Sequence, residues 1–203
     1  MTEPAWKDAH GLASWLGYLT ASEVDAIKAL SRMLPPDPLI VSIGAGAGTV
    51  TLAILEERPD ALIFSIDLKT NEDEINTNEH LRLAEAGYGH TGHVIRVWGD
   101  SKVVGRRWRF PVDLVVVDGD HTAGGLQGDI NVWLPQVRPG GIIAFHDYTR
   151  KLHPDVKPVV DAAFENKPRL LWVDTLIAFR VGQVLPTDPL CCGRCDSGQV
   201  PSC

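Results

Sequence analysis

Cysteine is nearly absent from this chain of 203 residues, and all four cysteines lie close to the C-terminal end. They are Cys191, Cys192, Cys195 and Cys203. A core without cysteine is typical of proteins in reducing compartments, and it excludes a disulfide framework. Cys192 and Cys195 have the spacing of half a zinc site, but no second pair and no nearby histidine completes it. We therefore expect free thiols, with a disulfide or a metal site as the less favoured alternatives.

An excess of positive charge is also lacking. Lysine and arginine number 19 against 26 aspartates and glutamates, which gives a net charge of −7. This balance gives no general attraction to nucleic acid or to an anionic membrane, so a small-molecule partner is the expectation. Arg106, Arg107 and Arg109 form a local exception that could bind a small anion, although a solvated loop face is the simpler interpretation.

A long apolar run is the third absence. The longest stretch without charge, residues 38–55, contains three glycines together with Ser42, Thr49 and Thr51, which favours a strand, a turn and a helix over a membrane span. The chain does not begin with a basic and then an apolar segment, so no secretory signal is expected. These absences predict a cytoplasmic protein and leave a homo-oligomer open.

Short apolar runs alternate with helix-like segments through most of the chain. The expected strands are residues 39–43, 62–66, 94–98, 114–117, 142–145, 170–173 and 176–181. Helices are expected after Thr20 and over residues 49–57, 71–86, 126–133 and 156–164. The alternation predicts an α/β fold with a Rossmann-like, doubly wound, seven-stranded sheet. Only two residues separate the last two strands, so the last strand should be antiparallel.

The domain organisation follows from the same pattern. Residues 38–182 form the predicted domain, residues 1–37 a helical lead-in, and residues 183–203 a tail expected to be poorly ordered. Thr20 and Glu23 have the spacing of a capping box at the start of the lead-in helix. Arg138-Pro-Gly-Gly141 predicts a tight turn of type II.

The first expected strand runs into a glycine turn, Gly44-x-Gly46-x-Gly48, which is followed by a helix. Such a turn exposes backbone N–H groups at a helix N-terminus, where a polar ligand can bind. A dinucleotide fingerprint would need a further glycine at position 49, where this chain has threonine. Asp67 ends the next strand and is placed to accept ribose hydroxyl groups. A nucleotide-like ligand is predicted, and an NAD-linked oxidoreductase is one alternative.

Four of the expected strands end in polar residues. These are Asp67, then Asp100 and Ser101, then Asp118, Asp120 and His121, and finally His146 and Asp147. Ligands of open α/β sheets bind beyond the carboxyl ends of the strands. The four strand ends and the glycine turn therefore predict one site.

The motifs GAGAG, SIDL, WGDS, VVVDGDH and RPGGIIAFHDY together resemble the class I S-adenosylmethionine-dependent methyltransferases. More narrowly, they resemble small-molecule O-methyltransferases of the macrocin type and cephalosporin hydroxylase-like proteins. The resemblance covers about residues 20–182 and implies methyl transfer from S-adenosylmethionine to a hydroxyl of a small polar molecule. The cofactor-binding residues that it implies are Gly44, Gly46, Gly48, Asp67, Asp100, Ser101 and Asp118.

The resemblance also implies a divalent ion, Mg²⁺ or Mn²⁺, at the ends of the strands over residues 114–117 and 142–145. Asp118, His146 and Asp147 are the implied ligands. His121, Asp118 and Asp147 are the candidate catalytic residues, with His121 as general base, metal ligand or hydrogen-bonded turn residue.

Two positions depart from the pattern of these relatives. Ser42 stands where many carry an acidic residue, and Thr122-Ala123 stands where Ser-Tyr often follows the DGDH motif. A cofactor-binding relative that does not methylate, or one that is hydroxylase-like, is therefore a further alternative.

Overall fold

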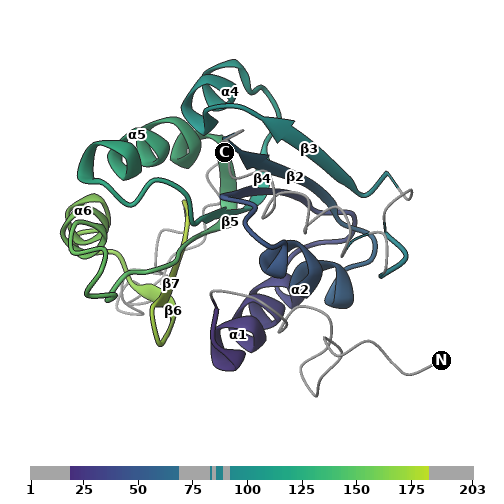
Figure 1. Cartoon of the computed structure of the whole chain (residues 1–203), viewed down its shortest axis with the longest axis horizontal. Coiled ribbons are helices and arrows are strands. Elements are labelled where there is room, and N and C mark those ends of the chain that lie inside the picture. The colour runs from purple at the N-terminus through teal and green to yellow at the C-terminus, as the bar shows by residue number, and fades with distance from the viewer. Residues whose placement is uncertain (1–18, 69–82, 84–85, 89–91, 183–203) are drawn as a thin grey trace, which may run out of the picture.

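The computed structural model describes residues 19–68, 83, 86–88 and 92–182 (Figure 1). The tail over residues 183–203 lies outside this part, and so do residues 1–18 of the lead-in and nearly all of the helix predicted over residues 71–86.

The described residues contain one sheet of seven strands in the order β3-β2-β1-β4-β5-β7-β6 (Figure 1). The strands are β1 (Leu39–Ile43), β2 (Leu62–Asp67), β3 (Val94–Trp98), β4 (Val112–Val117), β5 (Val137–Phe145), β6 (Arg169–Val173) and β7 (Leu176–Arg180). Strands β1 to β5 pair in parallel, and β7 is antiparallel to both β5 and β6. The predicted fold class is confirmed, including the direction of the last strand.

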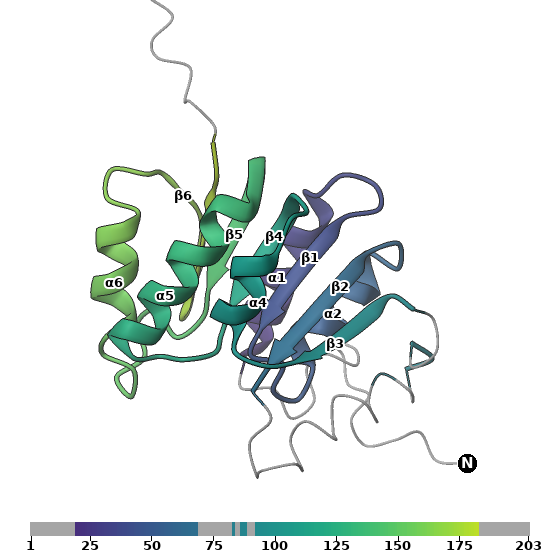
Figure 2. The ribbon, with the colours of Figure 1, turned by 90° about the horizontal axis from the view of Figure 1, so that it is seen from above.

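Helices cover both faces of the sheet (Figure 2). They are α1 (Ala21–Arg32) and α2 (Thr49–Glu57) on one face, and α4 (Ser101–Arg107), α5 (Ala123–Trp133) and α6 (Val156–Ala163) on the other. Successive strand residues supply the two apolar layers, because side chains alternate between the faces. Ile40 and Leu114 are buried on the side of α1 and α2, whereas Val41 and Val115 are buried on the side of α5 and α6.

One local prediction needs correction, and one helix was not predicted. Residues 138–141, expected as a turn between elements, belong to β5. Gly140 has the positive φ of 84° that a type II turn needs, but here it makes the strand irregular, and the register with β4 shifts between Val112 and Leu114. The sequence also gave no indication of α4, in whose last turn Arg106 and Arg107 lie.

The edge at which the parallel strands begin, here called the amino edge, comprises residues 37–39, 58–62, 111–113 and 137–138. Its charged side chains stabilise the fold. Arg58 donates to the carbonyl oxygens of Ser31 and Leu34 at 3.2 and 2.8 Å, and it pairs with Asp60 at 2.7 Å. Arg58 therefore joins the end of α1 to the start of β2.

Asp113 makes a second such anchor at the amino edge. Its carboxylate accepts the N–H of Leu39 at 2.8 Å and pairs with Nε of Arg138 at 2.6 Å, which connects β1, β4 and β5. Within the described part of the chain, no helix is both long and apolar enough to cross a membrane.

Candidate functional site

A pocket of about 550 Å³ lies at the opposite edge, where the parallel strands end. We call this the carboxyl edge, and it comprises residues 44–48, 67–68, 99–101, 118–121 and 146–147. The residues that line the pocket are Ile43, Gly44, Gly46, Ile66, Asp67, Leu68, Gly99, Asp100, Ser101, Lys102, Asp118, Gly119, Asp120, His121, Asp129, Asp147, Arg150 and His153. The pocket therefore extends from the glycine turn to the acidic ends of β4 and β5.

The three glycines of the turn differ in what they do. Gly44 has a φ of 84°, and a Cβ there would lie 2.0 Å from the carbonyl oxygen of Asp118, so only glycine fits between the ends of β1 and β4. Gly46 lines the pocket, and a Cβ on it would meet no atom within 4 Å, which leaves space for a ligand. Its N–H donates to Oδ2 of Asp67 at 3.2 Å. Gly48, with a φ of 77°, is the N-cap residue of α2.

The carboxylates at the ends of β2 and β3 line the glycine side of the pocket. Asp67 is fixed by its contact with Gly46, and Asp100 caps α4 by accepting the N–H of Lys102 at 2.8 Å. Ser101 donates its hydroxyl to Asp129 of α5, which the sequence analysis did not single out. Burial raises the pKa of Asp129. Six of the seven predicted cofactor residues therefore line the pocket, whereas Gly48 does not, and Ser101 is engaged by another side chain.

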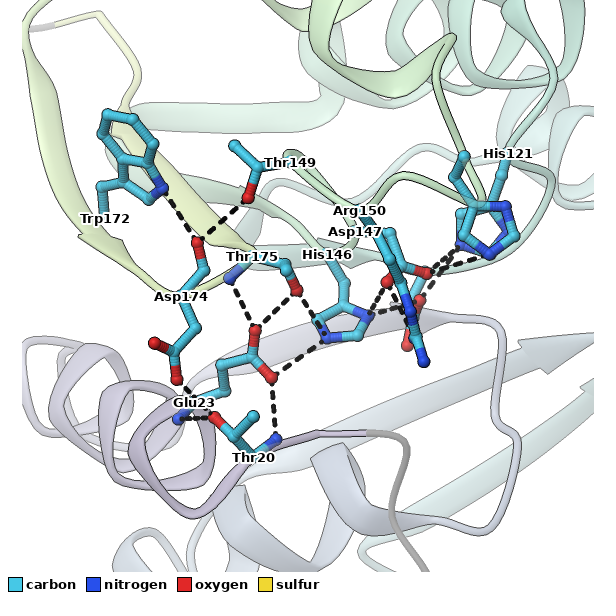
Figure 3. A network of polar contacts seen from close by, with 12 residues as sticks. Thr20, Glu23, His121, His146, Asp147, Thr149, Arg150, Trp172, Asp174 and Thr175 are labelled. Carbon is cyan, nitrogen blue, oxygen red and sulfur yellow. Dashed lines mark hydrogen bonds and ion pairs between the residues drawn. The ribbon is translucent and has the colours of Figure 1, made fainter.

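The ends of β4 and β5 bring two carboxylates and two histidines together (Figure 3). His121 Nε2 lies 3.4 Å from Asp118 Oδ1 and 3.0 Å from Asp147 Oδ2. His146 Nδ1 lies 3.1 Å from the same oxygen of Asp118 and 3.5 Å from Asp147 Oδ1. One ligand atom each from Asp118, His146 and Asp147 lie within 4.8 Å of one another. The three residues predicted as metal ligands therefore converge on one point.

Both histidines bind protons tightly in this arrangement. Hydrogen bonds to Asp118 and Asp147 raise the pKa of His121 to about 9, although its partial burial acts in the opposite direction. Burial lowers the pKa of His146, but contacts with Asp118, Asp147 and Glu23 outweigh it and raise the pKa to about 11. Burial alone would raise the pKa of Asp147, but hydrogen bonds from the two histidines hold it well below its usual range. At neutral pH both imidazoles are protonated.

Two residues of the loop after β5 that were not predicted from the sequence also contact Asp147. Arg150 Nη1 lies 3.0 Å from Asp147 Oδ1, and His153 Nε2 lies 3.6 Å from Asp147 Oδ2. The ring of His153 stacks on that of His121 with the centroids 4.0 Å apart. Both line the pocket, but no local motif marks this contact between two loops.

Glu23 is a further residue that was not predicted. The sequence indicated its capping role, which is confirmed, because the Glu23 N–H donates to Thr20 Oγ1 and the Thr20 N–H to Glu23 Oε2. Its carboxylate also lies 3.3 Å from Nε2 of His146, 123 residues further along the chain (Figure 3).

Three other positions of the sequence motifs have structural partners, whereas a fourth, Ser42, has none among the described residues. Asp120 accepts the N–H and hydroxyl of Thr122, which lowers its pKa. Thr122 in turn caps α5 by accepting the N–H of Gly125 at 3.1 Å. Tyr148, at the end of the FHDY motif, is buried and donates to Asp161. Ser42 is buried in β1 with no partner for its hydroxyl among the described residues.

Several solved structures share this fold. CalS11, a TDP-rhamnose 3'-O-methyltransferase of calicheamicin biosynthesis, superposes with a TM-score of 0.65 at 16% identity and covers 90% of this chain and 89% of its own. TomG from Streptomyces achromogenes, an O-methyltransferase of tomaymycin synthesis solved with S-adenosylmethionine, gives 0.62 at 19% identity, with 88% and 91% covered. A Staphylococcus aureus protein assigned as a caffeoyl-CoA O-methyltransferase gives 0.64 at 16% identity, with 81% and 84% covered. At such identities the likeness establishes the fold.

The sequence itself establishes the family. A family model described as a methyltransferase domain matches residues 41–148, which is 108 of the 203 residues. The match begins in β1 and ends at Tyr148, so it includes the glycine turn and the ends of β4 and β5. The chain therefore belongs to this methyltransferase-domain family.

Proposed function

We propose that this protein is an S-adenosylmethionine-dependent methyltransferase that acts on a hydroxyl group of a small polar molecule, with a divalent ion at the carboxyl edge. One observation carries the proposal: a single pocket joins the glycine turn and Asp67 to the cluster of Asp118, His121 and Asp147. A cofactor site and a reaction site thus share one cavity. Its volume of about 550 Å³ suits a small-molecule site rather than a macromolecular surface.

The residues on the glycine side fit the cofactor. The open space at Gly46 admits its methionyl part close to the backbone, and Asp67 is placed to accept the ribose hydroxyls. Asp100 is placed to accept from the adenine amino group. A hydrogen bond to a carboxylate is worth about 1.5–3 kcal/mol net, so these two residues could provide most of the specificity. When bound, S-adenosylmethionine supplies a methyl group on a positively charged sulfur.

The residues on the other side fit a divalent ion. Asp118 and Asp147 would supply hard oxygen ligands, and His146 would supply an imidazole once binding of the ion displaces its Nδ1 proton, a set that Mg²⁺ or Mn²⁺ accepts. Such an ion lowers the pKa of a bound substrate hydroxyl and orients it. The contribution of the chain is to hold these three side chains, with Arg150 and His121 fixing the carboxylate of Asp147. Methyl transfer is an in-line displacement, and the largest contribution that a protein can make to it is to position the reacting groups.

His121 is the candidate for proton transfer. It lines the pocket, but its raised pKa means that it is protonated while it contacts both carboxylates. A role as general base therefore depends on a cation that takes over the contacts with Asp118 and Asp147. Without that exchange, His121 acts as a hydrogen-bond donor that orders the two carboxylates.

Calorimetry separates this proposal from its alternatives. The full chain is titrated with S-adenosylhomocysteine and, in a matched experiment, with NAD⁺. Binding of the first and not of the second is expected. The reverse would support the oxidoreductase and refute the proposal. Methyl transfer from labelled S-adenosylmethionine to a panel of phenols, sugars and hydroxy acids then tests the chemistry, and cofactor binding without any transfer would favour a non-methylating relative.

A further inference from the structure

We infer that Glu23 of α1 is a positioning residue of this site, which holds the ring of His146 so that Nδ1 is directed at Asp118 and Asp147. The inference rests on the proposed function, in which His146 is a ligand of the divalent ion. It also makes the first described helix, which lies before the segment matched by the family model, part of the site. The capping box accounts for the hydrogen bond that the Glu23 carboxylate accepts from Thr20, but not for its contacts with Thr175 and His146.

The carboxylate of Glu23 is fully engaged and only 1% exposed. Oε1 accepts the N–H of Thr175 at 2.8 Å and its hydroxyl at 2.6 Å. Oε2 accepts the N–H of Thr20 at 2.8 Å and lies 3.3 Å from Nε2 of His146 (Figure 3). Glu23 thereby connects the start of α1, the link between β6 and β7, and the end of β5.

These contacts decide which nitrogen of His146 carries a proton toward Glu23. Thr175 gives its hydroxyl proton to Glu23 Oε1, so its oxygen can only accept from His146 Nε2, which lies 3.3 Å away. The carboxylate of Glu23 also only accepts. Both neighbours of Nε2 are therefore acceptors, and Nε2 must be the N–H. In the neutral ring, the lone pair is then on Nδ1, the atom that faces the two aspartates.

Helix capping alone does not require this burial. A capping glutamate can accept the N–H of the N-cap residue at the protein surface. Burial of a carboxylate, in contrast, costs free energy unless donors surround it. Here four donors offset that cost, and three of them are side-chain or backbone groups of Thr175 and His146. Carboxylates that accept the outer N–H of a ligating histidine fix its tautomer and orientation, and their loss typically weakens metal binding about 10–100-fold.

The test compares Glu23→Gln with Thr20→Val in the full chain. Glutamine keeps the shape of Glu23 but removes its charge, so the Nε2–H of His146 loses its carboxylate acceptor. Thr20→Val removes the hydroxyl that caps α1 and bonds Asp174 at 2.7 Å, but it leaves the carboxylate beside His146. The control therefore weakens the same helix without changing the proposed contact.

Two readouts are used. Imidazole ¹⁵N–¹H spectra of the metal-free protein, assigned with His146→Asn, report the Nε2 proton. Mn²⁺ titration followed by electron paramagnetic resonance reports the ion site. A downfield Nε2 proton, hydrogen-bonded to the carboxylate, is expected in the wild type and in Thr20→Val and should move upfield in Glu23→Gln, together with about a 10–100-fold loss of Mn²⁺ affinity.

The outcomes separate the inference from the proposed function. An unchanged Nε2 proton in Glu23→Gln, or a loss of Mn²⁺ affinity no larger than in Thr20→Val, overturns the role of Glu23 while the ion site stands. Wild-type protein that binds no Mn²⁺ refutes the ion site, and the spectra alone then decide on Glu23. If Glu23→Gln does not fold, Glu23→Asp, which retracts the carboxylate by one methylene, replaces it with the same readouts.

Discussion

The two edges of the sheet use the same residue types for different purposes. At the amino edge, Asp60 pairs with Arg58, and Asp113 pairs with Arg138. At the carboxyl edge, Asp118 and Asp147 share two histidines, and Asp67 and Asp100 line the same pocket. The role of an acidic residue in this fold therefore depends on whether it lies at the beginning or at the end of a strand. The predictions below test this contrast.

The largest effect is expected from Gly44→Ala. A Cβ would lie 2.0 Å from the Asp118 carbonyl in a backbone region that alanine avoids, which should cost at least ~3 kcal/mol of folding stability. Gly46→Ala is the control: Gly46 also has a positive φ, of 48°, but a Cβ there meets no protein atom within 4 Å, so only the backbone strain remains. We expect it to be much less destabilised but to bind S-adenosylhomocysteine more weakly. Similar melting temperatures for the two variants would contradict the account of the turn.

Asp118→Asn should abolish measurable Mn²⁺ binding. It should also lower the rate of any methyl transfer by at least about 100-fold, because the substrate oxygen loses the ion that stabilises its negative charge. Affinity for S-adenosylhomocysteine should fall less than in Asp67→Asn, since the cofactor contacts proposed for Asp67 and Asp100 remain and only the contact implied for Asp118 is lost. Asp113→Asn is the matched substitution at the amino edge and should retain ion binding. Equal losses in the two variants would mean that the two edges are not functionally distinct.

Asp67→Asn is expected to weaken S-adenosylhomocysteine binding by about 10-fold or more, as for the loss of one charge-assisted hydrogen bond. Asp60→Asn, at the amino edge near the start of the same strand, should leave that affinity unchanged. Calorimetric titration of both variants makes the comparison, and an unchanged affinity in Asp67→Asn would remove the ribose role.

The smallest effect concerns acid stability at the amino edge. The hydrogen bond from Arg58 holds the pKa of Asp60 below its ordinary value of 3.8. A carboxyl with a lowered pKa in the folded state stabilises the protein above pH 3.8, and this contribution disappears as the pH falls below it. Since Asp60 is partly exposed, the gain should be at most ~1 kcal/mol. Urea unfolding of wild type and Asp60→Asn should differ at pH 6 and converge near pH 2; a constant difference would contradict this.

Much of the fold could be predicted because buried parallel strands have a recognisable apolar pattern. The bounds of β1, α2 and β3 agree with those expected from the sequence. The helix α4 could not be predicted, because its seven residues lack an apolar stripe and include Gly105. That glycine allows α4 to pack directly against α5, where a Cβ would lie 2.2 Å from Val132. A tertiary contact, and not local preference, thus decides this helix.

The candidate site was likewise predictable only where it does not depend on tertiary contacts. The strand-end aspartates were predictable, because parallel strands place their carboxyl ends at one edge. The contacts of Glu23 and His153 were not, since each depends on segments far apart in the chain or on two facing loops. Glu23 was also fully explained by a local motif, and nothing in the sequence indicated a second partner.

The central claim is that the carboxyl edge holds a methyl-donor cofactor beside a divalent ion. A crystal structure of the protein grown with S-adenosylhomocysteine and Mn²⁺, with an anomalous difference map, tests it directly. The account predicts the ribose at Asp67 and an anomalous peak bound by Asp118, His146 and Asp147. A cofactor bound elsewhere, or a pocket that holds the cofactor while the three ligands show no peak, would contradict it.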